Sequence, residues 1–100
     1  MKKRKQKSIP NNLRKYRRAK GLTQKEVAFV LGLKGITLLS RWESGVRVPG
    51  LLDIFKLALL YRTMVDALFM DLRRSLKDEI SKQETRLLQA RQRRQNTGHR

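Results

Sequence analysis

The chain has 100 residues, 39% of them apolar, which suits one small domain with a single core. It contains no cysteine and one histidine, His99, which argues against disulfide frameworks, cysteine zinc sites and histidine-based catalytic or metal clusters. Twenty-five Lys and Arg face eight Asp and Glu, giving a net charge of +17. This excess favours an anionic partner, most often nucleic acid and next a membrane surface.

The positive charge is concentrated at the two ends of the chain. Residues 1–20 carry ten basic and no acidic side chains, residues 21–70 carry six and four, and residues 71–100 carry nine and four. No apolar stretch follows the basic start as it would in a signal peptide, and no apolar run has the length of a membrane span. We therefore expect a cytoplasmic protein with a balanced folded unit between basic ends and no membrane partner.

The first predicted elements are a basic arm over residues 1–10 and a helix that follows it. The arm shows no periodicity and ends at Pro10. Asn11 is a candidate N-cap, and the helix is expected to run to Lys20 with Gly21 as the residue that ends it.

The next helix has the clearest local signal. Thr23 and Glu26 have the spacing of a capping box, which predicts a helix from Gln24 to a stop at Gly32. Its inward face is expected to include Val27, Ala28 and Leu31. Phe29 and Val30 are interpreted as an extension of the core, with a partner surface as the alternative.

Two further helices are predicted on either side of a short connector. One begins near Gly35 or Ile36 and ends at Glu43 or Ser44, with its Leu39 and Trp42 three residues apart and facing inward. The other follows Pro49. Its predicted apolar stripe consists of Leu51, Ile54, Phe55, Ala58 and Leu59.

The last predicted helix starts near Val65, with Thr63 as a possible N-cap. Its apolar stripe consists of Val65, Phe69, Leu72, Leu76 and Ile80. Residues 89–100 have the composition of a frayed basic tail. The expected domains are thus an arm over 1–10, a folded unit over 11–72, and a helical extension with a basic tail over 73–100.

Several short motifs between Asn11 and Phe69 together resemble the lambda-repressor-like family, also called Cro/C1-type or XRE-type helix-turn-helix proteins. The matching residues are Gly21-Leu-Thr-Gln24, Ser40-Arg-Trp-Glu-Ser-Gly45, Gly45-Val-Arg-Val-Pro49 and Asp66-Ala-Leu-Phe69. The segment Leu33 to Thr37 looks one residue longer than is usual there. The resemblance implies an all-α, five-helix domain with a helix-turn-helix and an extended C-terminal helix.

The resemblance also implies a set of residues that contact double-stranded DNA, and a structural ion pair between Arg17 and Glu43. The expected contacts to bases and phosphates are Gln24, Lys34, Ile36, Thr37, Ser40, Arg41 and Arg47. Arg41 is the candidate for a bidentate bond to guanine, whereas Lys34 and Arg47 suit phosphates. A thymine methyl would explain an apolar contact from Ile36 or from Leu38, and the sequence leaves both open.

The arm is expected to add contacts through Lys2, Lys3, Arg4 and Lys5, either as an electrostatic tether or in a minor groove. Leu76 and Ile80 lie beyond the expected core, which favours a two-fold homodimer on a palindromic site with half-sites a helical turn apart. The alternative for that stripe is an amphipathic tail without a partner.

The expected function is that of a sequence-specific transcriptional regulator, a repressor, associated with the nucleoid through its DNA. The alternatives are an antitoxin that regulates its own operon beside a toxin partner, a protein-bridging cofactor, and an RNA-binding protein. An enzyme is disfavoured because no nucleophile–base pair or catalytic carboxylate pair is present, and neither a cofactor nor a metal is expected.

Overall fold

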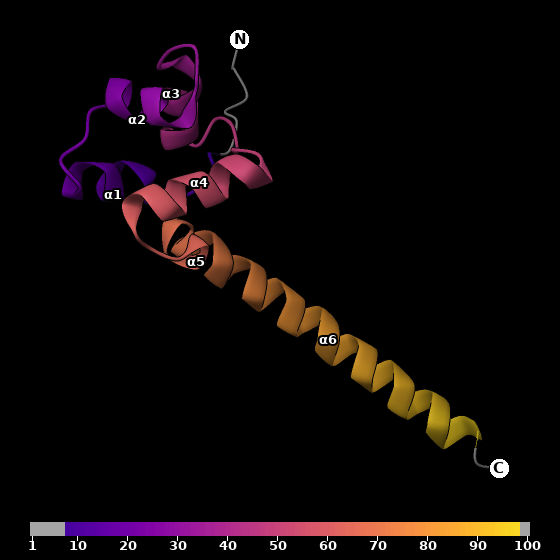
Figure 1. Cartoon of the computed structure of the whole chain (residues 1–100). Helices are drawn as coiled ribbons and strands as arrows, with labels where there is room; N and C mark the ends of the chain where they lie inside the picture. Colours follow the sequence, from indigo (N-terminus) through magenta and orange to yellow (C-terminus); the bar gives the residue numbers. More distant parts are fainter. Residues whose placement is uncertain (1–7, 99–100) are drawn as a thin grey trace, which may run out of the picture.

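The computed structural model describes residues 8–98, with side chains up to residue 95, and within this range the chain forms helices and no strand. Figure 1 shows the first five helices gathered at one end and the sixth projecting from them as a rod, along a longest extent of 67 Å. The elements in chain order are α1 (Leu13–Ala19), α2 (Gln24–Leu31), α3 (Thr37–Glu43), α4 (Leu51–Tyr61), α5 (Val65–Leu68) and α6 (Met70–Gly98). The predicted all-α class is confirmed.

The start of α1 differs slightly from the prediction. The cap position is Asn12, whose side chain makes no capping bond, and the Leu13 amide instead donates to Oδ1 of Asn11 at 3.0 Å. Asn12 connects α1 to α5, because its backbone amide donates to the Leu68 carbonyl at 2.8 Å. The helix ends before Gly21, whose φ of +76° is the left-handed conformation that was predicted for it.

The signals around α2 are confirmed. The Thr23 side chain accepts from the Glu26 amide at 3.1 Å, and Glu26 accepts from the Thr23 amide at 2.8 Å. Gly32 ends the helix at φ +76°, so the capping box and the turn residue together fix both ends of α2. Val27, Ala28 and Leu31 are buried as expected.

Phe29 and Val30 lie outside the core. They are 84% and 58% exposed, so the interpretation that they extend the core is wrong. Phe29 is largely open to solvent, and Val30 lines a surface groove with Leu59 and Leu60 of α4.

The core lies where α1 to α5 meet, and its members come from all five helices and the residue after α5. It consists of Leu13, Val27, Leu31, Leu39, Trp42, Leu57, Ala58, Tyr61, Leu68 and Phe69. The stripe predicted for α4 is wrong in part. The helix buries Leu57, Ala58 and Tyr61, whereas Leu51, Phe55 and Leu59 are 69%, 52% and 76% exposed.

The single helix predicted from Val65 is two helices, which is why the fold has six helices in the described range instead of five. Phe69 leaves the helical conformation at φ −130° and ψ 44°, and the new helix begins at Met70. Thr63 does not cap α5, because the cap position is Met64 and no side chain bonds there. The break allows Leu68 and Phe69 to turn into the core while the chain changes direction.

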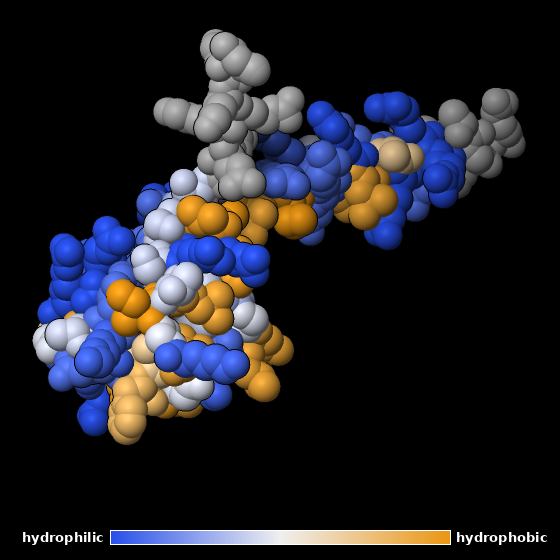
Figure 2. Space-filling model, turned by 90° about the horizontal axis from the view of Figure 1, so that it is seen from above, coloured by the Kyte–Doolittle hydropathy of each residue, from blue (hydrophilic) through white to orange (hydrophobic). Residues whose placement is uncertain are grey.

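The predicted frayed tail is also wrong, since α6 continues to Gly98. Every side chain from Arg73 to Gln95 is exposed. Figure 2 shows apolar side chains on this rod lying among hydrophilic ones. None of the helices in the described range has both the length and the apolar character needed to span a membrane.

Candidate nucleic-acid interface

The second and third helices form a helix-turn-helix unit. After Gly32 the chain bends through Lys34, Gly35 and Ile36 before α3 begins at Thr37. The φ of Gly35 is not positive, so the extra residue of this turn is accommodated by three successive bends and not by a second left-handed glycine. As a result α3 starts one or two residues later than the sequence predicts.

The two faces of α3 differ sharply in burial. Leu39 and Trp42 are 0% and 2% exposed, so they anchor the helix to the core as expected. Thr37 and Arg41 are exposed, and Ser40 is half-buried between the two faces. The burial of one face therefore leaves the other, with Arg41, available to a large partner.

The structure places Ile36 and Leu38, the two candidates for an apolar base contact, in different surroundings at the start of α3. Leu38 is half-buried and packs against the core, whereas Ile36 is 45% exposed. Ile36 is therefore the more exposed of the two at the start of α3.

Basic side chains stand at both ends of α3. Lys34 precedes the helix and Arg47 follows it, and both are exposed. The backbone amides of Val46 and Arg47 donate to the Arg41 carbonyl at 3.0 and 3.2 Å. This local turn fixes the backbone of Arg47 against the end of α3, where its side chain suits an anion beside the helix.

A buried carboxylate joins three helices behind this surface. Glu43 Oε2 accepts from Arg17 Nε at 2.6 Å, and its Oε1 accepts from Arg17 Nη2 at 3.2 Å, so the expected ion pair is present and bidentate. Oε1 also accepts from Gln24 Nε2 at 3.0 Å and from Arg14 Nε at 3.3 Å. Arg17 Nη1 donates in addition to the Leu22 carbonyl at 2.9 Å.

This network connects the C-terminal end of α3 to α1 and α2. Burial raises the pKa of the Glu43 carboxyl, but the hydrogen bonds from Arg17, Gln24 and Arg14 outweigh it and keep the pKa below its ordinary value. The hydrogen bond with Glu43 likewise raises the pKa of Arg17. Both groups are thus charged in the fold, and Gln24 braces α3 with one of its amide hydrogens.

A contact that the sequence does not reveal attaches the N-terminal segment to the end of α3. The Ile9 amide donates to the Gly45 carbonyl at 2.9 Å, and Asn11 Nδ2 donates to the Trp42 carbonyl at 3.1 Å. A Cβ on Gly45 would lie 2.5 Å from the Ile9 carbonyl oxygen. Gly45 was expected only as a helix stop, and this close approach is its second role.

The arm residues Lys2, Lys3, Arg4 and Lys5 lie outside the described residues. Their attachment point is nevertheless defined, because Ile9 is bonded to Gly45 directly after α3.

The buried anchor of α3, its exposed outer face and its flanking cations define a helix-turn-helix protein. A family model described as helix-turn-helix matches residues 13–66, and the chain belongs to this family, which is of the Cro/C1 type. It is thus a DNA-binding regulator of that family. No curated protein and no solved structure matches the chain.

Proposed function

We propose that the protein is a sequence-specific transcriptional repressor that inserts α3 into the major groove of double-stranded DNA and acts as a homodimer. The observation that carries the proposal is the exposure of Arg41 on a helix whose Leu39 and Trp42 are buried. A bound operator that overlaps a promoter would exclude the polymerase. The protein would then be found on the nucleoid, in the cytoplasm.

The residues around α3 divide into those that read bases and those that hold the backbone. Arg41 is proposed to bind guanine O6 and N7, with Thr37, Ser40 and Ile36 contacting the neighbouring bases. A second group of residues is proposed to bind phosphates, which positions the domain without reading sequence. It comprises the Gln24 amide and the cations Lys34, Arg47, Lys2, Lys3, Arg4 and Lys5.

Three alanine variants test this division against a duplex selected from a random pool. Arg41→Ala is expected to lose about 1–3 kcal/mol of discrimination at one base pair in each half-site. Arg47→Ala is expected to weaken binding to every sequence. It should also lower the slope of the log binding constant against log salt concentration, in magnitude, by about 0.9 per lost phosphate contact. Lys56→Ala removes the same charge from an exposed position on α4 and serves as the control.

Fluorescence anisotropy over single base-pair substitutions of that duplex gives the readout. The proposal is contradicted if Arg41→Ala keeps the parent's base preferences, or if the Lys56 control changes them equally.

A second function is favoured by the apolar surface on the outer side of α2 and α4. Phe29, Leu52 and Leu59 are 84%, 74% and 76% exposed, which is unusual for large apolar side chains. Such a surface suits a protein partner, as in an antitoxin bound to its toxin or a bridging cofactor. A Phe29→Ser, Leu59→Ser variant that binds operator normally but loses regulation in the cell would support this role; unchanged regulation would exclude it.

A further inference from the structure

The helix α6 carries an apolar stripe that nothing in the described residues covers. Leu76, Ile80 and Leu87 are 48%, 63% and 50% exposed, although each is a large aliphatic side chain. Most helix stability in proteins comes from the packing of an amphipathic face, yet every side chain of α6 from Arg73 to Gln95 is exposed. The stripe therefore indicates a partner along the rod.

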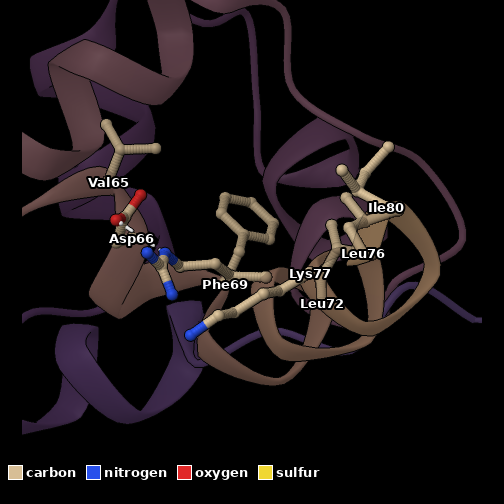
Figure 3. A pocket seen from close by; sticks show the side chains of 8 residues that line it. Val65, Asp66, Phe69, Leu72, Leu76, Lys77 and Ile80 are labelled. Atoms are coloured by element: carbon tan, nitrogen blue, oxygen red, sulfur yellow. Dashed lines mark hydrogen bonds and ion pairs between the residues drawn. The ribbon is translucent and has the colours of Figure 1, made fainter. Parts of the chain in front are cut away.

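The stripe begins in a groove at the root of the rod. This groove is lined by apolar side chains of α5 and α6, with Asp66, Arg73 and Lys77 at its edges. Figure 3 shows Phe69, Leu72, Leu76 and Ile80 along one side of it. Asp66 and Arg73, which form an ion pair at 3.0 Å, line this groove together with Phe69.

Spacing along α6 matches a coiled-coil heptad. The positions at alternating steps of three and four are Arg73, Leu76, Ile80, Gln83, Leu87 and Ala90. A seam of this kind packs against another long helix, and α6 itself is the one helix of that length in the described range.

We propose that α6 pairs with α6 of a second copy of this chain as an antiparallel two-stranded coiled coil. In the proposed register Leu76 packs against the partner's Leu87, and Ile80 packs against the partner's Gln83. Two-fold symmetry repeats both layers, so the seam contains four leucines. Near its centre, each of the two isoleucines packs against a glutamine.

Charge complementarity decides the direction of pairing. The charged residues beside the seam are Lys77, Glu84 and Arg91 on one edge and Glu79, Arg86 and Arg93 on the other. In the antiparallel register Lys77 meets the partner's Glu84, and Glu79 meets the partner's Arg86, which gives four attractive contacts. A parallel pair would instead set Glu79 beside the partner's Glu84 and Arg86 beside the partner's Arg91, which gives four repulsive contacts.

The direction of pairing also determines how the dimer meets DNA, a consequence that depends on the proposed function. Residue 69 lies opposite residue 94 of the partner, so the two helix-turn-helix units start about 37 Å apart along the rod. In a single copy α1 to α5 lie at one end of α6 (Figure 1), so antiparallel pairing places one unit at each end of the rod. We therefore expect an inverted repeat whose half-sites are centred at least one turn of B-DNA apart, about 34 Å.

Disulfide trapping in the absence of DNA tests the register, since the chain has no cysteine of its own. The Leu76→Cys, Leu87→Cys double variant is expected to form a covalent dimer on mild oxidation, and so is a mixture of the two single variants. Either single variant alone is expected to stay monomeric on a denaturing gel, because like positions are about 16 Å apart along the rod. A covalent dimer from a single variant, or none from the double variant, would overturn the proposal.

Charge reversal provides a test that leaves the seam untouched. Glu79→Arg should raise the dimer dissociation constant about tenfold, because two attractive contacts become repulsive. Adding Arg86→Glu should restore the affinity of the parent chain. Asp78→Arg makes the same change of charge on the side of α6 away from the seam and should have little effect.

Sedimentation equilibrium of the full chain without DNA gives these constants. A parallel pair predicts the opposite sign for Glu79→Arg, since the positive charge introduced there would face the partner's Glu84 and tighten the dimer, and that result would overturn the proposal. Because no DNA is present, these outcomes do not depend on whether α3 reads DNA. A trapped antiparallel dimer that selects no duplex would contradict the proposed function alone.

Discussion

The segment from Ser8 to Phe69 and the helix α6 differ in where their side chains lie. The first segment buries eleven apolar side chains around α1 to α5 and places a charged Arg17–Glu43 pair among them. The second exposes every side chain from Arg73 to Gln95. Changes in the first region should therefore alter folding and the position of α3, whereas changes in the second should act through association between copies.

The largest expected effect in the first region comes from its buried charge. Glu43→Ala should lower the free energy of unfolding by about 3–5 kcal/mol, because Arg17 is left buried without its partner. Asp66→Asn breaks an ion pair whose side chains are 69% and 54% exposed, and should cost at most about 0.5 kcal/mol. Urea denaturation measures both, and equal losses would contradict the contrast between a buried ion pair and an exposed one.

Acid should weaken the same network and lower the stability of the fold. The pKa of Glu43 is lower in the fold than in the unfolded chain, where a glutamate titrates near pH 4.3, roughly. Stability from ionised Glu43 is then present above the unfolded pKa and is lost as the pH falls through the folded value. Glu43→Gln should make unfolding stability less sensitive to pH below about 4, and an unchanged acid profile would show that this carboxylate is not the group responsible.

A smaller effect is expected at Gly45. Gly45→Ala should cost about 2 kcal/mol or more, because φ is +81° and the new Cβ would meet the Ile9 backbone. Gly32→Ala has a φ of +76° with open space around it and should cost about 1 kcal/mol. Thermal unfolding of the two variants separates the cost of the steric contact with Ile9 from the cost of the backbone strain. Equal losses of stability would mean that the Ile9 backbone can move away at little cost.

A small effect of the opposite sign is expected at Tyr61. Burial, with the nearby Glu43 charge, raises the pKa of its hydroxyl to about 12, and the oxygen has no hydrogen-bond partner among the described residues. Tyr61→Phe removes an unsatisfied polar atom and should leave stability unchanged or raise it by up to about 1 kcal/mol. A loss of more than 1 kcal/mol, roughly, in urea denaturation would reveal a partner for this hydroxyl.

Much of the fold could be predicted because its signals are local. The Thr23–Glu26 capping box and the glycines at positions 21, 32 and 45 determine where helices begin and end through their own backbone chemistry. The Leu39–Trp42 spacing identifies the buried face of α3, since few other residues of that helix compete for the core. These features located the helix-turn-helix unit without knowledge of the tertiary structure.

Other features could not be predicted because they depend on contacts distant in sequence. All residues of α4 except Asp53 and Lys56 are apolar or aromatic, so periodicity could not choose which face is buried. The break at Phe69 follows from burial of Leu68 and Phe69 in the core, and the α3 contacts of Ile9 and Asn11 cross more than 30 positions. The polar end of α6 gives no periodic signal, which made a long helix look like a tail.

Selection of bound duplexes from a random pool by the full chain tests the central claim most directly, because a preferred sequence requires the outer face of α3 to read bases. We predict recovery of one inverted repeat, with a guanine in each half-site that the Arg41→Ala variant no longer prefers. A pool that stays random after several rounds, at a protein concentration where duplex is retained, would contradict the claim that this face reads sequence.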